Sequence, residues 1–157
     1  MGTNGGDGDS IFETMVRFFE EDDWSYHQLE GESILRLGFT GENGSWRCYA
    51  EAKEERRQFV FYSILDTRVA EEKRPAMAEF LTRANYGMII GNFEMDYSDG
   101  EVRYKTSIDV DNERLTTGLV RTLVYMNVLL TDKYFPGIMK IIYADASPAE
   151  QIEEIEA

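Results

Sequence analysis

The side chains that most often act as bases or nucleophiles are scarce in this sequence, which has one histidine, His27, and one cysteine, Cys48. A general base needs a reacting group within hydrogen-bond reach. The sequence assigns no nucleophile to His27, so we interpret it as a surface or half-buried strand residue. Cys48 alternates with apolar residues on the predicted buried side of a strand, where cysteine behaves as a small hydrophobic residue. The two residues are also too few for an ordinary zinc site.

A calcium loop is the first possible metal site, because residues 95–101 combine acids with a glycine. EF-hand loops place acids or amides at the first, third and fifth positions before the glycine. Those positions hold Met95, Tyr97 and Asp99 here, so the pattern fails. A hairpin turn at residues 98–100, Ser-Asp-Gly, explains the segment better.

A second acidic cluster contains Asp109, Asp111 and Glu113. Three carboxylates in a loop could bind a cation weakly, but a solvated strand-to-helix loop explains them without a ligand. Phosphate-loop, Gly-x-Ser-x-Gly and His-Glu-x-x-His patterns are missing from the sequence. We therefore expect a protein that is not an enzyme, with no cofactor, and leave open whether the acidic loop binds a cation.

The composition is that of one acidic domain. The chain has 157 residues, with 16 basic and 30 acidic side chains and a net charge of −14. Such a charge disfavours binding to phosphate backbones and anionic lipids. The longest apolar stretch, at residues 119–130, is interrupted by Arg121 and Asn127 and is too short to span a membrane. Residues 1–9 do not resemble a signal peptide, so we expect a cytoplasmic protein without nucleic-acid or membrane partners.

The hydropathy pattern predicts an α+β fold with element order α-β-β-β(β)-α-β-β-α. The predicted helices begin at residues 10, 71 and 117, and the predicted strands are residues 24–29, 33–40, 45–53, 58–65, 88–97 and 101–110. Short turns between successive strands imply an antiparallel sheet with helices packed on one side. Residues 58–65 are apolar on both faces, which is typical of a strand that is central or covered on both sides.

The ends of the chain are expected to lie outside this domain. Ser10 and Glu13 have capping-box spacing and should begin the first helix. Pro136 should kink or end the last long helix, with a final helical piece after it. The acidic segment 144–157 could be a short frayed helix, but we expect a tail. The prediction is thus a single domain at residues 10–143, a flexible leader at 1–9 and an acidic tail at 144–157.

The long helix that begins near residue 117 carries more apolar residues than a single sheet can cover. A helix packed on a sheet needs an apolar arc of roughly 100°. The surplus should face another layer of the same chain, a second copy or a client protein, although a deeply buried core helix explains it equally well. The candidate partner or dimer interface has five members: Leu119, Leu123, Met126, Leu130 and Tyr134.

Residues 75–104 resemble the YbjN-like family of bacterial proteins, labelled sensory transduction regulators. The resemblance rests on the segments Asn85-Tyr86-Gly87, Gly91-Asn92-Phe93-Glu94-Met95-Asp96 and Asp99-Gly100-Glu101-Val102-Arg103-Tyr104. It extends through the element order to Tyr134-Phe135-Pro136. The family's fold is similar to that of the type III secretion chaperones, which are small, acidic, dimeric proteins that bind client segments without catalysis.

This resemblance implies a regulatory or chaperone-like role and transfers no catalytic residue. We therefore expect a non-enzymatic homodimer that binds a protein or peptide client, with an exposed sheet edge able to accept an extended segment. The alternative is a regulatory domain that binds a small molecule or ion in a pocket between helix and sheet. The identity of the client or ligand is not encoded in any motif of the sequence.

Overall fold

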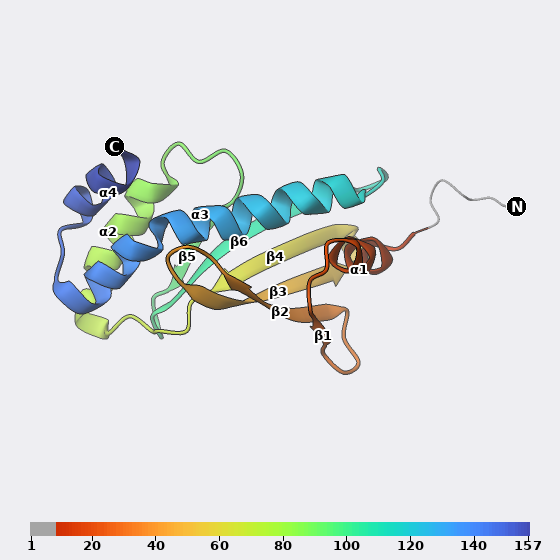
Figure 1. Ribbon diagram of the computed structural model, residues 1–157, viewed down its shortest axis with the longest axis horizontal. Coiled ribbons are helices and arrows are strands. Elements are labelled where there is room, and N and C mark those ends of the chain that lie inside the picture. The colour runs from red at the N-terminus through yellow and green to blue at the C-terminus, as the bar shows by residue number, and fades with distance from the viewer. Residues whose placement is uncertain (1–8) are drawn as a thin grey trace, which may run out of the picture.

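The computed structural model describes residues 9–157 as a six-stranded antiparallel sheet with four α-helices (Figure 1). The helices are α1 Ile11–Glu21, α2 Arg74–Asn85, α3 Thr117–Ala144 and α4 Pro148–Glu156. The strands are β1 His27–Gln28, β2 Ile34–Thr40, β3 Ser45–Lys53, β4 Gln58–Ile64, β5 Asn92–Asp96 and β6 Glu101–Asp109. Short 3-10 turns, η2 Glu54–Arg56 and η3 Glu71–Lys73, precede β4 and α2. The predicted α+β class and antiparallel sheet are confirmed.

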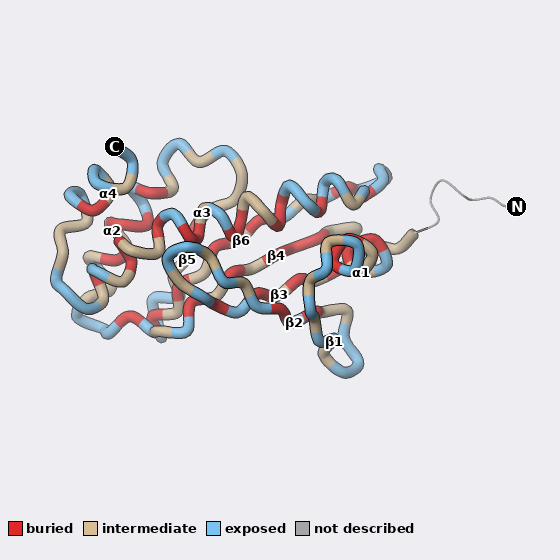
Figure 2. Tube along the Cα trace, viewed as in Figure 1, coloured by how far each residue is buried: buried red, intermediate tan, exposed pale blue. Residues whose placement is uncertain are grey.

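The strands lie in the order β1-β2-β3-β4-β6-β5, and every neighbouring pair is antiparallel. Helix α3 packs on β4 and β6, and α1 packs on β3 and on α3. The side chains that meet these helices alternate along each strand, as Cys48 and Ala50 do in β3 and Phe59 and Phe61 do in β4. Figure 2 shows this core as buried segments along the sheet and the adjoining side of α3. Helix α2 contacts β5 and α3, and α4 contacts α2 and α3.

Strand β4 lies in the interior of the sheet, between β3 and β6, as its two apolar faces predict. Val60 is buried although it points away from the α3 side, where Phe59 and Phe61 lie. Helix α1 also begins as predicted, because the Ser10 side chain accepts from the Glu13 backbone N–H and the Glu13 side chain accepts from that of Ser10. The helix ends at Glu21, within the acidic run.

Two predicted strands are shorter than the sequence pattern indicates. The first is reduced to β1, because the backbone of Asp23 takes a left-handed conformation and Trp24 turns inward over the sheet. The second, expected from residue 88, begins at β5. Gly91, just before β5, has a φ of 80°, and a Cβ there would lie 2.6 Å from the Tyr104 ring. Extended pairing therefore cannot begin before that glycine.

The C-terminal region differs from the expectation at two points. The helical piece expected after Pro136 is present, but the proline does not end the helix before it, since α3 continues through Pro136 to Ala144. The acidic segment is not simply a tail, because Pro148–Glu156 form helix α4. Ser147 caps this helix, and Ile152 and Ile155 pack against the core. The many carboxylates of this segment favoured the prediction of a tail, although its two isoleucines are three positions apart and so lie on one side of a helix.

The predicted leader, apart from Asp9, lies outside the described residues. Asp9 forms an ion pair with Arg17 of α1. In the described part of the chain, no helix has both the length and the hydropathy required to cross a membrane.

Candidate functional site

The two residues with catalytic potential occupy ordinary structural positions. His27 is exposed in the short edge strand β1. Cys48 is fully buried in β3, and its Sγ lies 3.7 Å from the Ser63 hydroxyl oxygen. Burial raises the pKa of the Cys48 thiol to about 12, so the nucleophilic thiolate is scarcely populated near neutral pH. Both residues therefore match their non-catalytic interpretations.

The acidic clusters organise turns. Asp109 accepts hydrogen bonds from the Gln58 side chain and from the Asp111 backbone N–H, each at 2.9 Å. At the β5–β6 hairpin, Asp96 accepts from the Ser98 backbone N–H at 2.9 Å. Among residues 9–157, no three side chains of the metal-ligating types lie together. Local hydrogen bonds thus account for the carboxylates of Asp109 and Asp96.

A buried polar network, which the sequence pattern did not predict, joins α3 to the sheet. The Ser63 hydroxyl donates to Asn127 Oδ1 at 2.6 Å. The Asn127 amide donates to the backbone carbonyls of Phe61 at 2.9 Å and Tyr104 at 3.1 Å. A buried network with its bonds satisfied fixes the register of the helix on the sheet. The available signal was an asparagine in the middle of an apolar run.

The five predicted interface residues do not share one surface. On the outer side of α3, Leu119 is 39% exposed, and Met126 and Leu130 are half-buried. Leu123 is only 8% exposed and Tyr134 only 4%, because both belong to the hydrophobic core of the chain. Hydropathy identified apolar positions correctly but could not tell which of them the sheet covers.

The residue that the prediction left out is Leu129, which is 57% exposed. Residues separated by three, four or seven positions lie on the same side of a helix. Leu129 follows Met126 by three positions, and Met126 follows Leu119 by seven. We call Leu119, Met126, Leu129 and Leu130 the α3 stripe.

The α3 stripe lies on the N-terminal half of the helix, and the C-terminal half is covered by α2 and α4 (Figure 1). The charges of α3 are unusual for this acidic chain. The helix carries three basic residues, Arg121, Lys133 and Lys140, and one acid, Asp132, whose side chain is buried. The stripe therefore adjoins the least negative helix surface.

Comparisons with known proteins agree with this fold. The sequence profile of the YbjN family, described as "Putative bacterial sensory transduction regulator", matches residues 12–139. The crystal structure of YbjN from E. coli, titled a "putative transcription regulator", is similar with a TM-score of 0.58 and 11% identity, over 87% of this chain and 94% of that chain. This likeness shows a shared fold.

A weaker likeness is to the structure of the HopA1-SchA chaperone-effector complex. Its TM-score is 0.48 at 11% identity, over 74% of this chain and 84% of that chain. No curated protein matches the sequence. Since the matched profile covers well over half of the chain, the protein belongs to the YbjN family.

Proposed function

We propose that this protein is a non-enzymatic regulatory module of the cytoplasm that binds a protein or peptide client, and that it is a homodimer joined through the α3 stripe. The observation that carries the proposal is the stripe itself, whose most exposed members are Leu119 and Leu129. Exposed apolar side chains that share one side of a helix are typical of surfaces that bind proteins.

Charge favours a second copy of the chain as the occupant of the stripe. Two molecules with a net charge of −14 repel each other, so they should meet where carboxylates are fewest. The outer surface of α3 satisfies this condition, because its exposed charged residues are basic. A two-fold axis across α3 would place each stripe against its own copy and keep the acidic surfaces apart.

The regulatory part of the proposal is supported by the family's description, and the non-enzymatic part by the burial of Cys48 and the use of acids in turns. The alternative, a ligand pocket between α3 and the sheet, has less support. Asn127 and Ser63 occupy that interface, where the Ser63 hydroxyl donates to Asn127 Oδ1 and the Asn127 amide donates to two backbone carbonyls.

The experiment is a mass measurement by light scattering over a range of concentrations. We expect twice the protomer mass of 18.1 kDa for the native chain and a single protomer for Leu129→Glu. Tyr143→Glu is the matched control, because Tyr143 is 71% exposed on the same helix but outside the stripe. A native chain that stays at 18.1 kDa at every concentration overturns the dimer. A dimer that survives Leu129→Glu, with helix content unchanged, overturns the assignment of its interface.

A further inference from the structure

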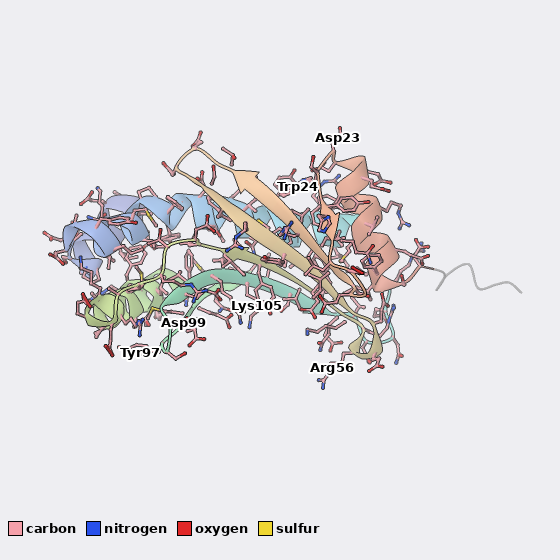
Figure 3. All side chains as sticks on the ribbon, turned by 90° about the horizontal axis from the view of Figure 1, so that it is seen from below. Asp23, Trp24, Arg56, Tyr97, Asp99 and Lys105 are labelled. Atoms are coloured by element: carbon pink, nitrogen blue, oxygen red, sulfur yellow. The ribbon has the colours of Figure 1, made fainter. Side chains whose placement is uncertain are left out.

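A cleft of about 470 Å³ opens at the edge of the sheet, between the turn that follows α1, strand β2 and helix α3. The residues that shape it are Asp22, Asp23, Trp24, Phe39, Thr40 and Tyr125. Figure 3 shows Asp23 at the outer end of the turn after α1 and Trp24 closer to the strands. The α3 stripe does not contribute to this cleft.

The edge of β2 is open along the cleft. Strand β1 pairs only with Leu35 and Arg36, so β2 continues beyond it without a partner strand on that side. The Leu29 N–H donates to the Ile34 carbonyl, which places the backbone groups of even-numbered β2 residues toward the edge. Gly38 and Thr40 therefore direct backbone hydrogen-bonding groups into the cleft region. Such groups are a template for an added extended segment.

The floor of the cleft is aromatic and preformed. Trp24 stacks on Phe39 with ring centroids 5.8 Å apart and meets Tyr125 edge-on at 6.1 Å. The Trp24 indole N–H lies 3.2 Å from an Asp22 carboxylate oxygen and 3.3 Å from the Tyr125 hydroxyl. Aromatic walls of this kind accommodate the aliphatic stems and cationic heads of Arg and Lys side chains.

The charge of the cleft is negative. Asp22 accepts from Tyr125 and lies 3.7 Å from Arg121. The hydrogen bond from Tyr125 holds the pKa of Asp22 below its ordinary value, so this carboxylate is ionised near neutral pH. Asp23 has no ion-pair or side-chain hydrogen-bond partner among residues 9–157, and no Lys or Arg lines the cleft. Arg121 offsets the charge of Asp22, so the uncompensated negative charge is that of Asp23, and a cation is its complementary occupant.

We propose that this cleft binds a basic extended peptide segment. Its backbone pairs with Gly38 and Thr40 at the open edge of β2, and one Arg or Lys side chain enters the cleft toward Asp22 and Asp23. The open edge favours a peptide over a free amine, because a free amine leaves the backbone groups unused. The proposal rests on the protein-binding part of the proposed function and is independent of the dimer.

The test is an NMR titration of the full-length, ¹⁵N-labelled protein with the peptide acetyl-TVTRTVT-amide. We expect saturable shifts of the Gly38 and Thr40 amides and of the Trp24 indole. The same peptide with Glu in place of Arg should bind at least about tenfold more weakly, and so should a version with alternate backbone nitrogens methylated. N-acetyl-arginine amide alone should also bind at least about tenfold more weakly, because it cannot pair along the edge.

The protein variant for this titration is Asp23→Asn, which should weaken binding about threefold, in the range of one exposed ion pair. Its matched control is Asp111→Asn, since Asp111 is also an exposed aspartate with a left-handed backbone, in a different loop. Asp111→Asn and the stripe variant Leu129→Glu should both leave the affinity unchanged.

Any one of five results would overturn the proposal. If the Glu peptide binds as tightly as the Arg peptide, or if Asp23→Asn leaves the affinity unchanged, the cleft does not bind a cation. If the methylated peptide or N-acetyl-arginine amide binds as tightly as the Arg peptide, the ligand does not pair with the edge of β2. If Gly38, Thr40 and Trp24 show no saturable shift, the cleft neither binds the cation nor pairs with the peptide. This conclusion holds whether the protein is a monomer or a dimer.

Discussion

The side-chain amide of Asn43 donates a hydrogen bond of 2.9 Å to the backbone carbonyl of Asp132. This carbonyl lies four residues before Pro136, which has no N–H to donate to it. The Asp132 carboxylate in turn accepts from the backbone N–H groups of Glu42 at 3.0 Å and Asn43 at 2.8 Å. The β2–β3 turn thus supplies the donor that the proline removes, which explains why α3 continues through Pro136.

The first prediction concerns this substitution of donors. Asn43→Ala should lower the free energy of unfolding by about 1 kcal/mol, because the Asp132 carbonyl loses its partner. In a Pro136→Ala background the residue at 136 regains its N–H, so the same Asn43→Ala change should cost less. Urea unfolding of the four proteins in this cycle measures the difference. An equal cost of Asn43→Ala in both backgrounds would show that the amide does not replace the missing helical donor.

Much of the fold could be predicted because the spacing of apolar residues along a strand or helix indicates which of its sides is buried. Residues 101–110 alternate cleanly, and β6 occupies Glu101–Asp109. The predictions failed where contacts between residues far apart in the sequence determine the local structure. A proline predicts a helix end unless another segment satisfies the freed carbonyl, and Asn43 is far from Pro136 in sequence. No local pattern contains that contact.

The second prediction separates folding from association on α3. Leu123→Asp should unfold the protein, because Leu123 is only 8% exposed and the carboxylate would be buried without a partner. Leu129→Asp should leave the chain folded, because Leu129 is 57% exposed, and should abolish the proposed dimer. Circular dichroism measures the first effect and light scattering the second. A folded Leu123→Asp protein would contradict the packing of α3 on the sheet.

The third prediction is a pH dependence at Cys48. Burial raises the pKa of its thiol from about 9 to about 12 in the folded chain. Between pH 9 and 12 the thiol ionises in the unfolded chain but not in the folded one, which favours the unfolded chain. The contribution of this thiol to the free energy of unfolding is therefore fully present below pH 9 and is lost as the pH rises toward 12. Between pH 8 and 10.5 the native chain should lose up to about 2 kcal/mol more stability than Cys48→Ala.

Urea unfolding at the two pH values measures that difference, and the titrations of other groups are common to both proteins. As an independent check, a thiol reagent at pH 8 should modify Cys48 no faster than the chain opens. Rapid modification of the native protein would place the thiol at the surface.

The candidate site was less predictable than the fold, for a reason that Leu123 and Leu129 illustrate. Both are leucines on the same helix, and hydropathy gives them equal weight. Their exposure differs because β4 and β6 cover one side of α3, which only the packing of the sheet determines. The cleft at the sheet edge was equally hidden, since it joins Asp23, Phe39 and Tyr125 from three separate segments.

The fourth prediction tests whether α4 is an integral part of the domain. Gly137 of α3 packs so closely on its neighbours that a Cβ there would lie 2.7 Å from the Phe80 ring and 2.8 Å from the Ile155 side chain. Ile155→Ala should therefore lower the free energy of unfolding by about 1–2 kcal/mol, since the change leaves a gap between three helices. Glu153→Ala, at an exposed position of the same helix, is the control and should change stability by less than about 0.5 kcal/mol.

Gly137→Ala should also destabilise the protein, and Ile155→Ala should recover part of that loss by making room for the added methyl group. Urea unfolding of these variants decides the matter, because a loose acidic tail would make Ile155→Ala as harmless as Glu153→Ala.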